Sequence, residues 1–202
     1  MTADALVRRG RQLAGWTLAF NTVEVVLSLV AGISAGSIAL VGFGVDSFIE
    51  LAAGAIALWR LEEETELEGR SDADAISAWL VGASFLLLGV YLALRAFIAL
   101  LNQEAPAPSV LGIGIALVSL LVMPMLAREK RRVADALGSE ALKAECVQTS
   151  LCAWLAAILL AGLVLRAVFG WWWADPVAAI LMTPIIVRAG LETMRSTKGA
   201  AR

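Results

Sequence analysis

The sequence predicts an all-α integral membrane protein with six transmembrane helices, and three observations support this fold class. The 202 residues are 60% hydrophobic and have a mean hydropathy of +0.81, which excludes an ordinary soluble domain. The apolar stretches are long enough to cross a bilayer and are longer than typical core helices. In lipid, each stretch must pair its own backbone polar groups, so helices are expected throughout.

The six helices are expected to form a single transmembrane domain, residues 1-202, with no separate soluble domain. They are predicted at about residues 13-32, 37-60, 75-101, 108-127, 141-168 and 172-193. The first stretch has no obvious small-residue cleavage site, so we expect it to be retained rather than removed as a signal peptide.

The distribution of Lys and Arg predicts the orientation of the helices. Fourteen of the 16 basic residues precede the first helix, lie near the end of the chain from Arg188 onward, or lie near the connections between helices 2 and 3 and between 4 and 5; the exceptions are Arg95 and Arg166. Basic residues favour the cytoplasmic side, so both termini are expected there, in the plasma or inner membrane. The basic run AREKRR (127–132) is interpreted as an anchor of this topology. The net charge of -2 gives no indication of nucleic-acid binding.

The first helix carries Asn21 and Glu24 on one face. An ionisable residue inside a membrane helix is a functional candidate by default. We therefore consider Glu24 and Asn21 as an accessory pair or as part of a proton relay. The alternative is that Glu24 only satisfies another helix, through Asn21, Arg95 or a backbone group.

The second helix contains the central signal of the sequence, because Asp46 and Glu50 lie about halfway along it. Burying two ionisable residues there costs roughly 5 to 7 kcal/mol. Their i, i+4 spacing places both carboxylates on one face, as two ligands of one cation would be. A structural ion pair or hydrogen bond is the alternative. The acidic run that follows, residues 62-74, is interpreted as a solvated face, with a second metal site as the alternative.

The third helix ends in a short proline-rich turn, and the fourth contains Pro124 and runs down to the basic anchor. The fifth carries Glu145, Gln148 and Cys152. Its two cysteines, six residues apart on one helix, do not suggest a disulfide. The sixth opens with WWWADP, where the tryptophans indicate a membrane interface and Asp175 is predicted to be the N-cap of that helix.

A short internal repeat connects the second and fifth helices. Gly36-Ser37-x-Ala39-Leu40 recurs 102 residues later as Gly138-Ser139-x-Ala141-Leu142. The same displacement relates Asp46 to Gln148 and Glu50 to Cys152. Because helices three apart run in opposite directions, this predicts a 3+3 inverted repeat, a design that places substrate sites near the midplane.

The four residues Asp46, Glu50, Gln148 and Cys152 form a plausible cation site. Carboxylates with a sulfur ligand suit zinc or another divalent transition metal better than magnesium or calcium. The chain has no histidine, so an imidazole-rich site is excluded. Glu145 is a candidate for relaying protons, since metal uptake releases protons from the ligands. Interhelical packing is the alternative for Gln148 and Cys152.

Six helices, the stretch from Gly32 to Leu40 entering a helix with acidic residues at i, i+4, a related fifth helix and the Asp-Pro opening of the sixth together resemble the cation diffusion facilitator (cation efflux) family. The resemblance covers residues 8 to 195. It implies a homodimeric exporter of divalent cations (zinc, manganese, iron, cobalt or cadmium) driven by proton antiport.

The resemblance also implies the transport site. The family uses His or Asp followed by Asp on helices 2 and 5, and these positions correspond here to Asp46, Glu50, Gln148 and Cys152. The last two depart from the family pattern. The metallochaperone-like cytoplasmic domain that usually follows helix 6 is expected to be absent, because few residues remain after Arg195. A dimer would then be held by its membrane helices.

The sequence therefore predicts a divalent transition-metal efflux transporter, with zinc the first choice, that exchanges metal for protons by alternating access. One alternative is a non-transporting metal-responsive or accessory membrane protein. Another is a small exporter of organic cations, for which Trp154 on the fifth helix would provide an aromatic contact. An enzyme is not expected, since Cys152 has no histidine to act as its base and no nucleotide or cofactor motif is present.

Overall fold

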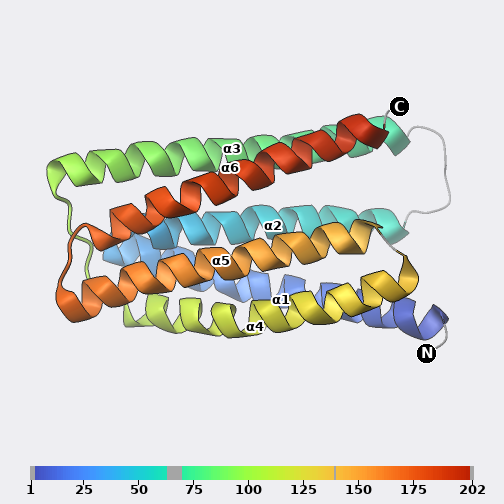
Figure 1. Ribbon diagram of the computed structural model, residues 1–202, viewed down its shortest axis with the longest axis horizontal. Helices are drawn as coiled ribbons and strands as arrows, with labels where there is room; N and C mark the ends of the chain where they lie inside the picture. Colours follow the sequence, from blue (N-terminus) through green and yellow to red (C-terminus); the bar gives the residue numbers. More distant parts are fainter. Residues whose placement is uncertain (1–2, 63–69, 139, 201–202) are drawn as a thin grey trace.

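In a computed structural model, the described residues 3–62, 70–138 and 140–200 form six α-helices that run alongside one another (Figure 1). They are α1 (Ala3–Ala35), α2 (Ile38–Glu62), α3 (Arg70–Asn102), α4 (Val110–Leu137), α5 (Glu140–Phe169) and α6 (Ala174–Ala200). Each contains a stretch long and apolar enough to cross a membrane. The predicted all-α membrane fold class is confirmed.

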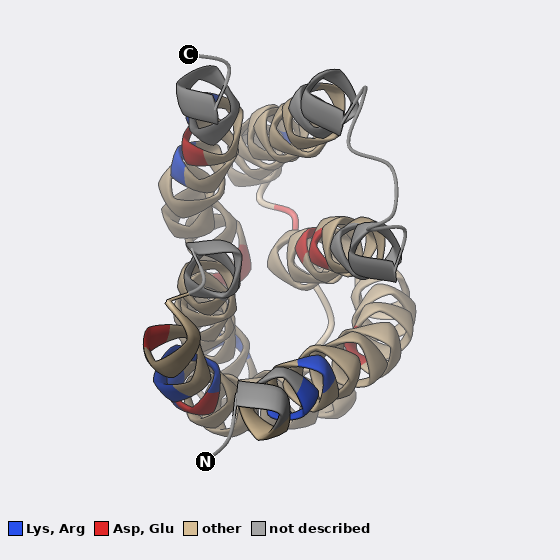
Figure 2. Ribbon diagram, turned by 90° about the vertical axis from the view of Figure 1, so that its right-hand side faces the viewer, with Lys and Arg blue, Asp and Glu red and all other residues tan. Residues whose placement is uncertain are grey.

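The helices extend beyond their predicted apolar cores. α1 begins at Ala3 rather than near residue 13, and α4 continues to Leu137 rather than ending near 127, so the basic run is helical. Bilayer thickness limits only the apolar part of a helix, and Ala, Leu, Arg, Lys and Glu are good helix formers beyond it. Figure 2 views the end of the bundle that carries both termini, where Lys and Arg occur on α1, α4 and α6.

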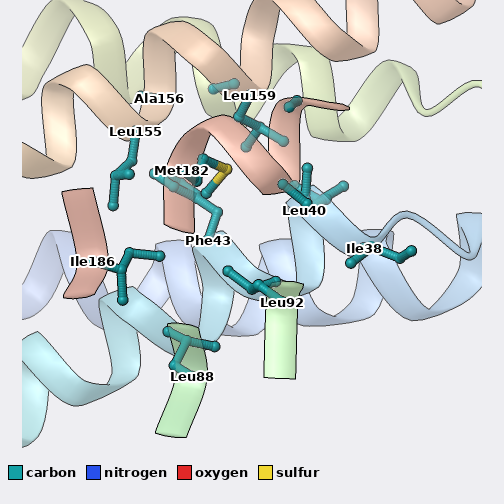
Figure 3. Close-up of a cluster of buried hydrophobic side chains, with 14 of the residues drawn as sticks. Ile38, Leu40, Phe43, Leu88, Leu92, Leu155, Ala156, Leu159, Met182 and Ile186 are labelled. Atoms are coloured by element: carbon teal, nitrogen blue, oxygen red, sulfur yellow. The ribbon is translucent and has the colours of Figure 1, made fainter. Parts of the chain in front are cut away.

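α2 lies at the centre of the bundle. It packs against α1, α3, α5 and α6, while α3 packs on α6 and α4 packs on both α5 and α1. The buried core draws on all six helices, and the members labelled in Figure 3 come from α2, α3, α5 and α6. Its labelled members are Ile38, Leu40, Phe43, Leu88, Leu92, Leu155, Ala156, Leu159, Met182 and Ile186.

α3 and α6 approach each other through two glycines. A Cβ on Gly190 would lie 2.8 Å from the carbonyl oxygen of Gly82, and a Cβ on Gly82 would lie 2.8 Å from the carbonyl oxygen of Gly190. Membrane helices associate through such small residues because lipid supplies no hydrophobic drive between them. The α3–α6 contact therefore depends on the absence of side chains at both positions.

The two halves of the chain share a local design at the start of α2 and of α5. α1 packs against α2 as α4 packs against α5. Gly36 and Gly138, at the two turns, have φ values of 67° and 64°, in the left-handed region that glycine adopts without strain. The wider 3+3 inverted repeat remains a prediction.

The predicted role of Asp175 as the N-cap of the last helix is wrong. α6 already begins at Ala174, and the buried Asp175 carboxylate instead accepts hydrogen bonds from the Ser37 hydroxyl and from the backbone N–H of Ile38, at 2.8 Å for the latter. These groups form the N-terminus of α2, where backbone N–H groups lack partners within the helix. A carboxylate from another helix satisfies them and compensates the helix dipole.

We predict that Asp175→Ala lowers the stability of the bundle by roughly 2 to 4 kcal/mol, because it leaves buried donors at the start of α2 unpaired. The measurement is thermal unfolding of the purified protein in detergent. Ser109→Ala is the matched control, since Ser109 caps α4 through a single bond to the N–H of Gly112 at 3.0 Å and its loss should cost only about 1 kcal/mol. Equal losses would contradict the special role of Asp175.

Candidate metal site

Asp46 and Glu50 of α2 meet Cys152 of α5 inside the bundle. Each offers a ligand atom, two carboxylate oxygens and a sulfur, and these atoms all lie within 4.8 Å of one another. Asp46 and Cys152 are buried, with 3% and 0% of their surfaces exposed, and Glu50 is half-buried. The i, i+4 spacing on α2 and the packing of α5 against it bring the three together.

Several buried polar atoms around this cluster lack hydrogen-bond partners within the described residues. They are Asp46 Oδ2, Gln148 Nε2, Asn21 Oδ1 and Ser28 Oγ. An unpaired buried polar atom costs about 1 to 3 kcal/mol, and native structures contain few of them. The unpaired Asp46 oxygen beside a second carboxylate and a sulfur is the arrangement that a cation would satisfy.

The other predicted site residues differ in how closely they approach the cluster. Asn21 is buried on α1 and donates through Nδ2 to Glu50 Oε2 at 3.4 Å. Gln148 is half-buried, one helical turn before Cys152. The side chain of Glu145 and the acidic run at 62-74 lie outside the residues whose side chains the structure describes.

Glu24 joins four helices beside the cluster. Its carboxylate on α1 accepts hydrogen bonds from Ser47 of α2, at 2.7 Å, and from Ser119 of α4, and the Cys152 sulfur of α5 lies 3.9 Å from it. The expected partners Asn21 and Arg95 are not the ones used: Asn21 bonds Glu50, and Arg95 pairs with Glu104 at 3.5 Å. Small hydroxyls satisfy Glu24 because closely packed helices leave room only for short donors.

Sequence reasoning missed Lys130. The role of the basic run as an anchor of the topology stays a prediction, but Lys130 within it is only 2% exposed and its Nζ lies 3.4 Å from Thr149 Oγ1 on α5. It is also within electrostatic range of Glu50. The signal was available, since the buried positions of α4 at Ser119, Met123 and Ala127 continue with helical spacing to Lys130.

Comparison with known proteins adds independent information. A family model described as the cation efflux transmembrane domain matches residues 16–198. An uncharacterized transporter of Synechocystis sp. is 25% identical over 177 residues, which cover 85% of this chain and 57% of that protein. The cation-efflux pump FieF of Shewanella oneidensis is 27% identical over 169 residues, covering 78% of this chain and 55% of the pump. The chain thus spans about half the length of these relatives.

The two cysteines of the chain provide a direct test of the cluster. Because the Cys152 sulfur lies with Asp46 and Glu50 whereas Cys146 is not in the cluster, we predict that Cd²⁺ produces a sulfur-to-metal charge-transfer band in the near ultraviolet. Cys146→Ser should retain this band and Cys152→Ser should lose it. A band that depends on Cys146 instead would place the sulfur ligand elsewhere.

Proposed function

Because the chain belongs to the cation efflux family, we propose that it exports a divalent transition metal from the cytoplasm in exchange for protons, by alternating access. Members of this family are transporters rather than enzymes. The single observation that carries the proposal is the buried cluster of two carboxylates and one sulfur within membrane-spanning helices, including a carboxylate oxygen without a hydrogen-bond partner in the described chain. The proposed ligands are Asp46, Glu50 and Cys152, with Gln148 as the fourth.

Zinc is the proposed cargo, with cobalt, iron, manganese and cadmium as the metals to compare with it. Two carboxylates and a sulfur give the mixed oxygen and sulfur donor set that zinc accepts in tetrahedral sites. Magnesium and calcium prefer oxygen ligands throughout, so the sulfur of Cys152 disfavours them. The absence of histidine from the chain means that selectivity would depend on Cys152 rather than on imidazole.

Proton exchange follows from the chemistry of the proposed ligands. Carboxylates and thiols must lose protons to bind a metal, so metal release is favoured when protons return. Glu24, in contact with Cys152, and Glu145 are the proposed accessory groups for this exchange. Both termini are proposed to lie in the cytoplasm, and the transporter is proposed to be a homodimer in the inner membrane.

One buried basic side chain lies near the proposed site and affects its net charge. Lys130 is the one basic side chain that is buried among the described residues, and it reaches α5 at Thr149, next to Gln148. Its ammonium offsets part of the negative charge of Glu50. We propose that this limits the affinity for a divalent ion and so allows the ion to leave.

The organic-cation alternative loses its aromatic contact in this arrangement. Trp154, the aromatic residue that the alternative requires near the acids, is 65% exposed on α5, whereas Cys152 on the same helix faces the core. A non-transporting metal-binding protein remains the second candidate, because it would use the same cluster. Glu50→Ala and Cys152→Ala separate the two functions, since only a transporter would lose flux along with binding.

We predict that wild-type protein in reconstituted vesicles carries zinc with saturable kinetics when a pH gradient is imposed, in the direction opposite to the proton flow. Asp46→Ala should reduce this flux by about 100-fold or more, because loss of a ligand should exceed the 10- to 100-fold cost of losing a supporting group. The fluorescence of a trapped metal indicator measures the flux, and cobalt, iron, manganese and cadmium are compared in the same vesicles. Metal-independent leakage in both proteins, or no flux of any metal in the wild type, would overturn the proposal.

We predict that Lys130→Met strengthens zinc binding by about tenfold, because a nearby positive charge no longer opposes the ion, and slows its release. Calorimetric titration in detergent measures the affinity. Lys130→Arg should keep the wild-type affinity. Arg132→Met is the control, since Arg132 is exposed and pairs with Glu129 at 2.6 Å on the outside of the helix. An unchanged affinity in Lys130→Met would show that Lys130 only supports packing.

A further inference from the structure

A groove lies between α4 and α5 on the face directed away from the metal cluster. Its volume is about 650 Å³. The apolar part of its lining includes Leu120 and Pro124 of α4 and Ala153, Trp154 and Ala157 of α5. Because Trp154 is largely exposed whereas Cys152 is buried, the groove opens on the outer surface of the bundle. We call this feature the α4–α5 groove.

The length and depth of the α4–α5 groove match one leaflet of a bilayer. Its α4 wall runs from Leu120 to Asp135, a rise of about 22 Å at 1.5 Å per residue. α4 begins at Val110, and a hydrocarbon core of about 30 Å takes up about 20 residues. Leu120 therefore lies near the midplane, and Arg128 lies where the hydrocarbon ends. The groove extends from the headgroup level to the centre of the membrane.

The end of the groove at headgroup level is basic. Arg128 and Arg131 both line it and are exposed, together with Asp135. Within the described part of the chain, neither guanidinium has a carboxylate at ion-pair distance. By contrast, the neighbouring Arg132 pairs with Glu129 and does not line the groove. Two arginines with one aspartate leave a positive site at the mouth of an apolar slot.

We propose that the α4–α5 groove binds one anionic phospholipid, with its phosphate at Arg128 and Arg131 and an acyl chain along Leu120, Ala153 and Ala157. Basic pockets between membrane helices attract anionic headgroups, and each nearby basic residue contributes about 1 kcal/mol.

The charge of the groove argues against other occupants. An organic cation would be repelled by the two arginines. In a parallel two-fold dimer, residues at equal depth meet, so a second copy seated on this face would bring Arg128 and Arg131 close to their own counterparts. A phospholipid alone matches both the charge at one end and the apolar length of the rest.

A bound lipid would stabilise the metal site from the outer side of α5. The groove and the cluster share α5: Val147, Ser150 and Trp154 line the groove, while Thr149 and Cys152 are buried on the inner side. A bound chain would hold α4 against α5, and it is this contact that joins Lys130 to Thr149. The binding itself does not require metal transport, so the two proposals fail separately.

The test is native mass spectrometry of the full chain in detergent with added phosphatidylglycerol or phosphatidylcholine. We expect one phosphatidylglycerol to bind at least about tenfold more tightly than phosphatidylcholine, as two arginines at about 1 kcal/mol each would give. Arg128→Gln and Arg131→Gln should each weaken binding about fivefold. Arg132→Gln removes the same charge one residue away and should leave the preference intact.

A second variant tests the apolar part of the groove without changing its charge. Ala153→Trp fills the slot and should abolish binding of the first lipid, while an unchanged thermal unfolding transition in detergent shows that the bundle is folded. Equal binding of the two lipids to the wild type, or an equal loss in Arg132→Gln, would overturn the proposal. Binding of water-soluble glycerol phosphate as tightly as the lipid would also overturn it, since the groove would then hold a free anion. So would a dimer that dissociates in Ala153→Trp, since the groove would then hold a second copy.

Discussion

The structure depends on the cost of holding Glu24, Asp46 and Glu50 within membrane-spanning helices. At roughly 2.5 to 3.5 kcal/mol for each residue, this cost is of the same order as the net stability of a small domain. The three carboxylates differ in their hydrogen bonding. Glu24 is satisfied by hydroxyls from Ser47 and Ser119, whereas Asp46 keeps an oxygen without a partner in the described residues. Glu24 therefore helps to join the helices, and Asp46 is left available for a ligand.

The position of Asp46 follows from the way in which α2 is held. Asp175 of α6 fixes the first residues of α2, and Asp46 lies about 12 Å farther along what is then a rigid rod. A Cβ on Gly44 would stand 3.0 Å from the side chain of Leu29 on α1, so this glycine lets the two helices approach just before Asp46. A cap at one end and a close contact near the middle set both the depth and the rotation of the carboxylate pair.

The fold and the central acidic pair could be predicted from the sequence because both rest on local signals, namely apolar length and i, i+4 spacing. The partners of these residues could not. That Ser119 bonds Glu24 depends on α1 packing against α4, and that Asp175 caps α2 depends on α6 crossing its start. Each such pair joins positions far apart in the chain. Asp175 did stand out in the sequence, but a role as the N-cap of its own helix, α6, explained its position equally well.

Lys130 shows why helix orientation is difficult to read in a membrane protein. In a soluble helix the apolar stripe marks the inner face, but a membrane helix is apolar all round and its stripe carries little information. Polar residues within the span then mark the inner face, as Asp46 does on α2. At the end of α4, polar residues do not mark the inner face, because the basic residues there are spread around the whole helix. Only the spacing from Ser119 through Ala127 continues inward to Lys130, so the inner face of a membrane helix is best traced from its small buried residues outward to its charges.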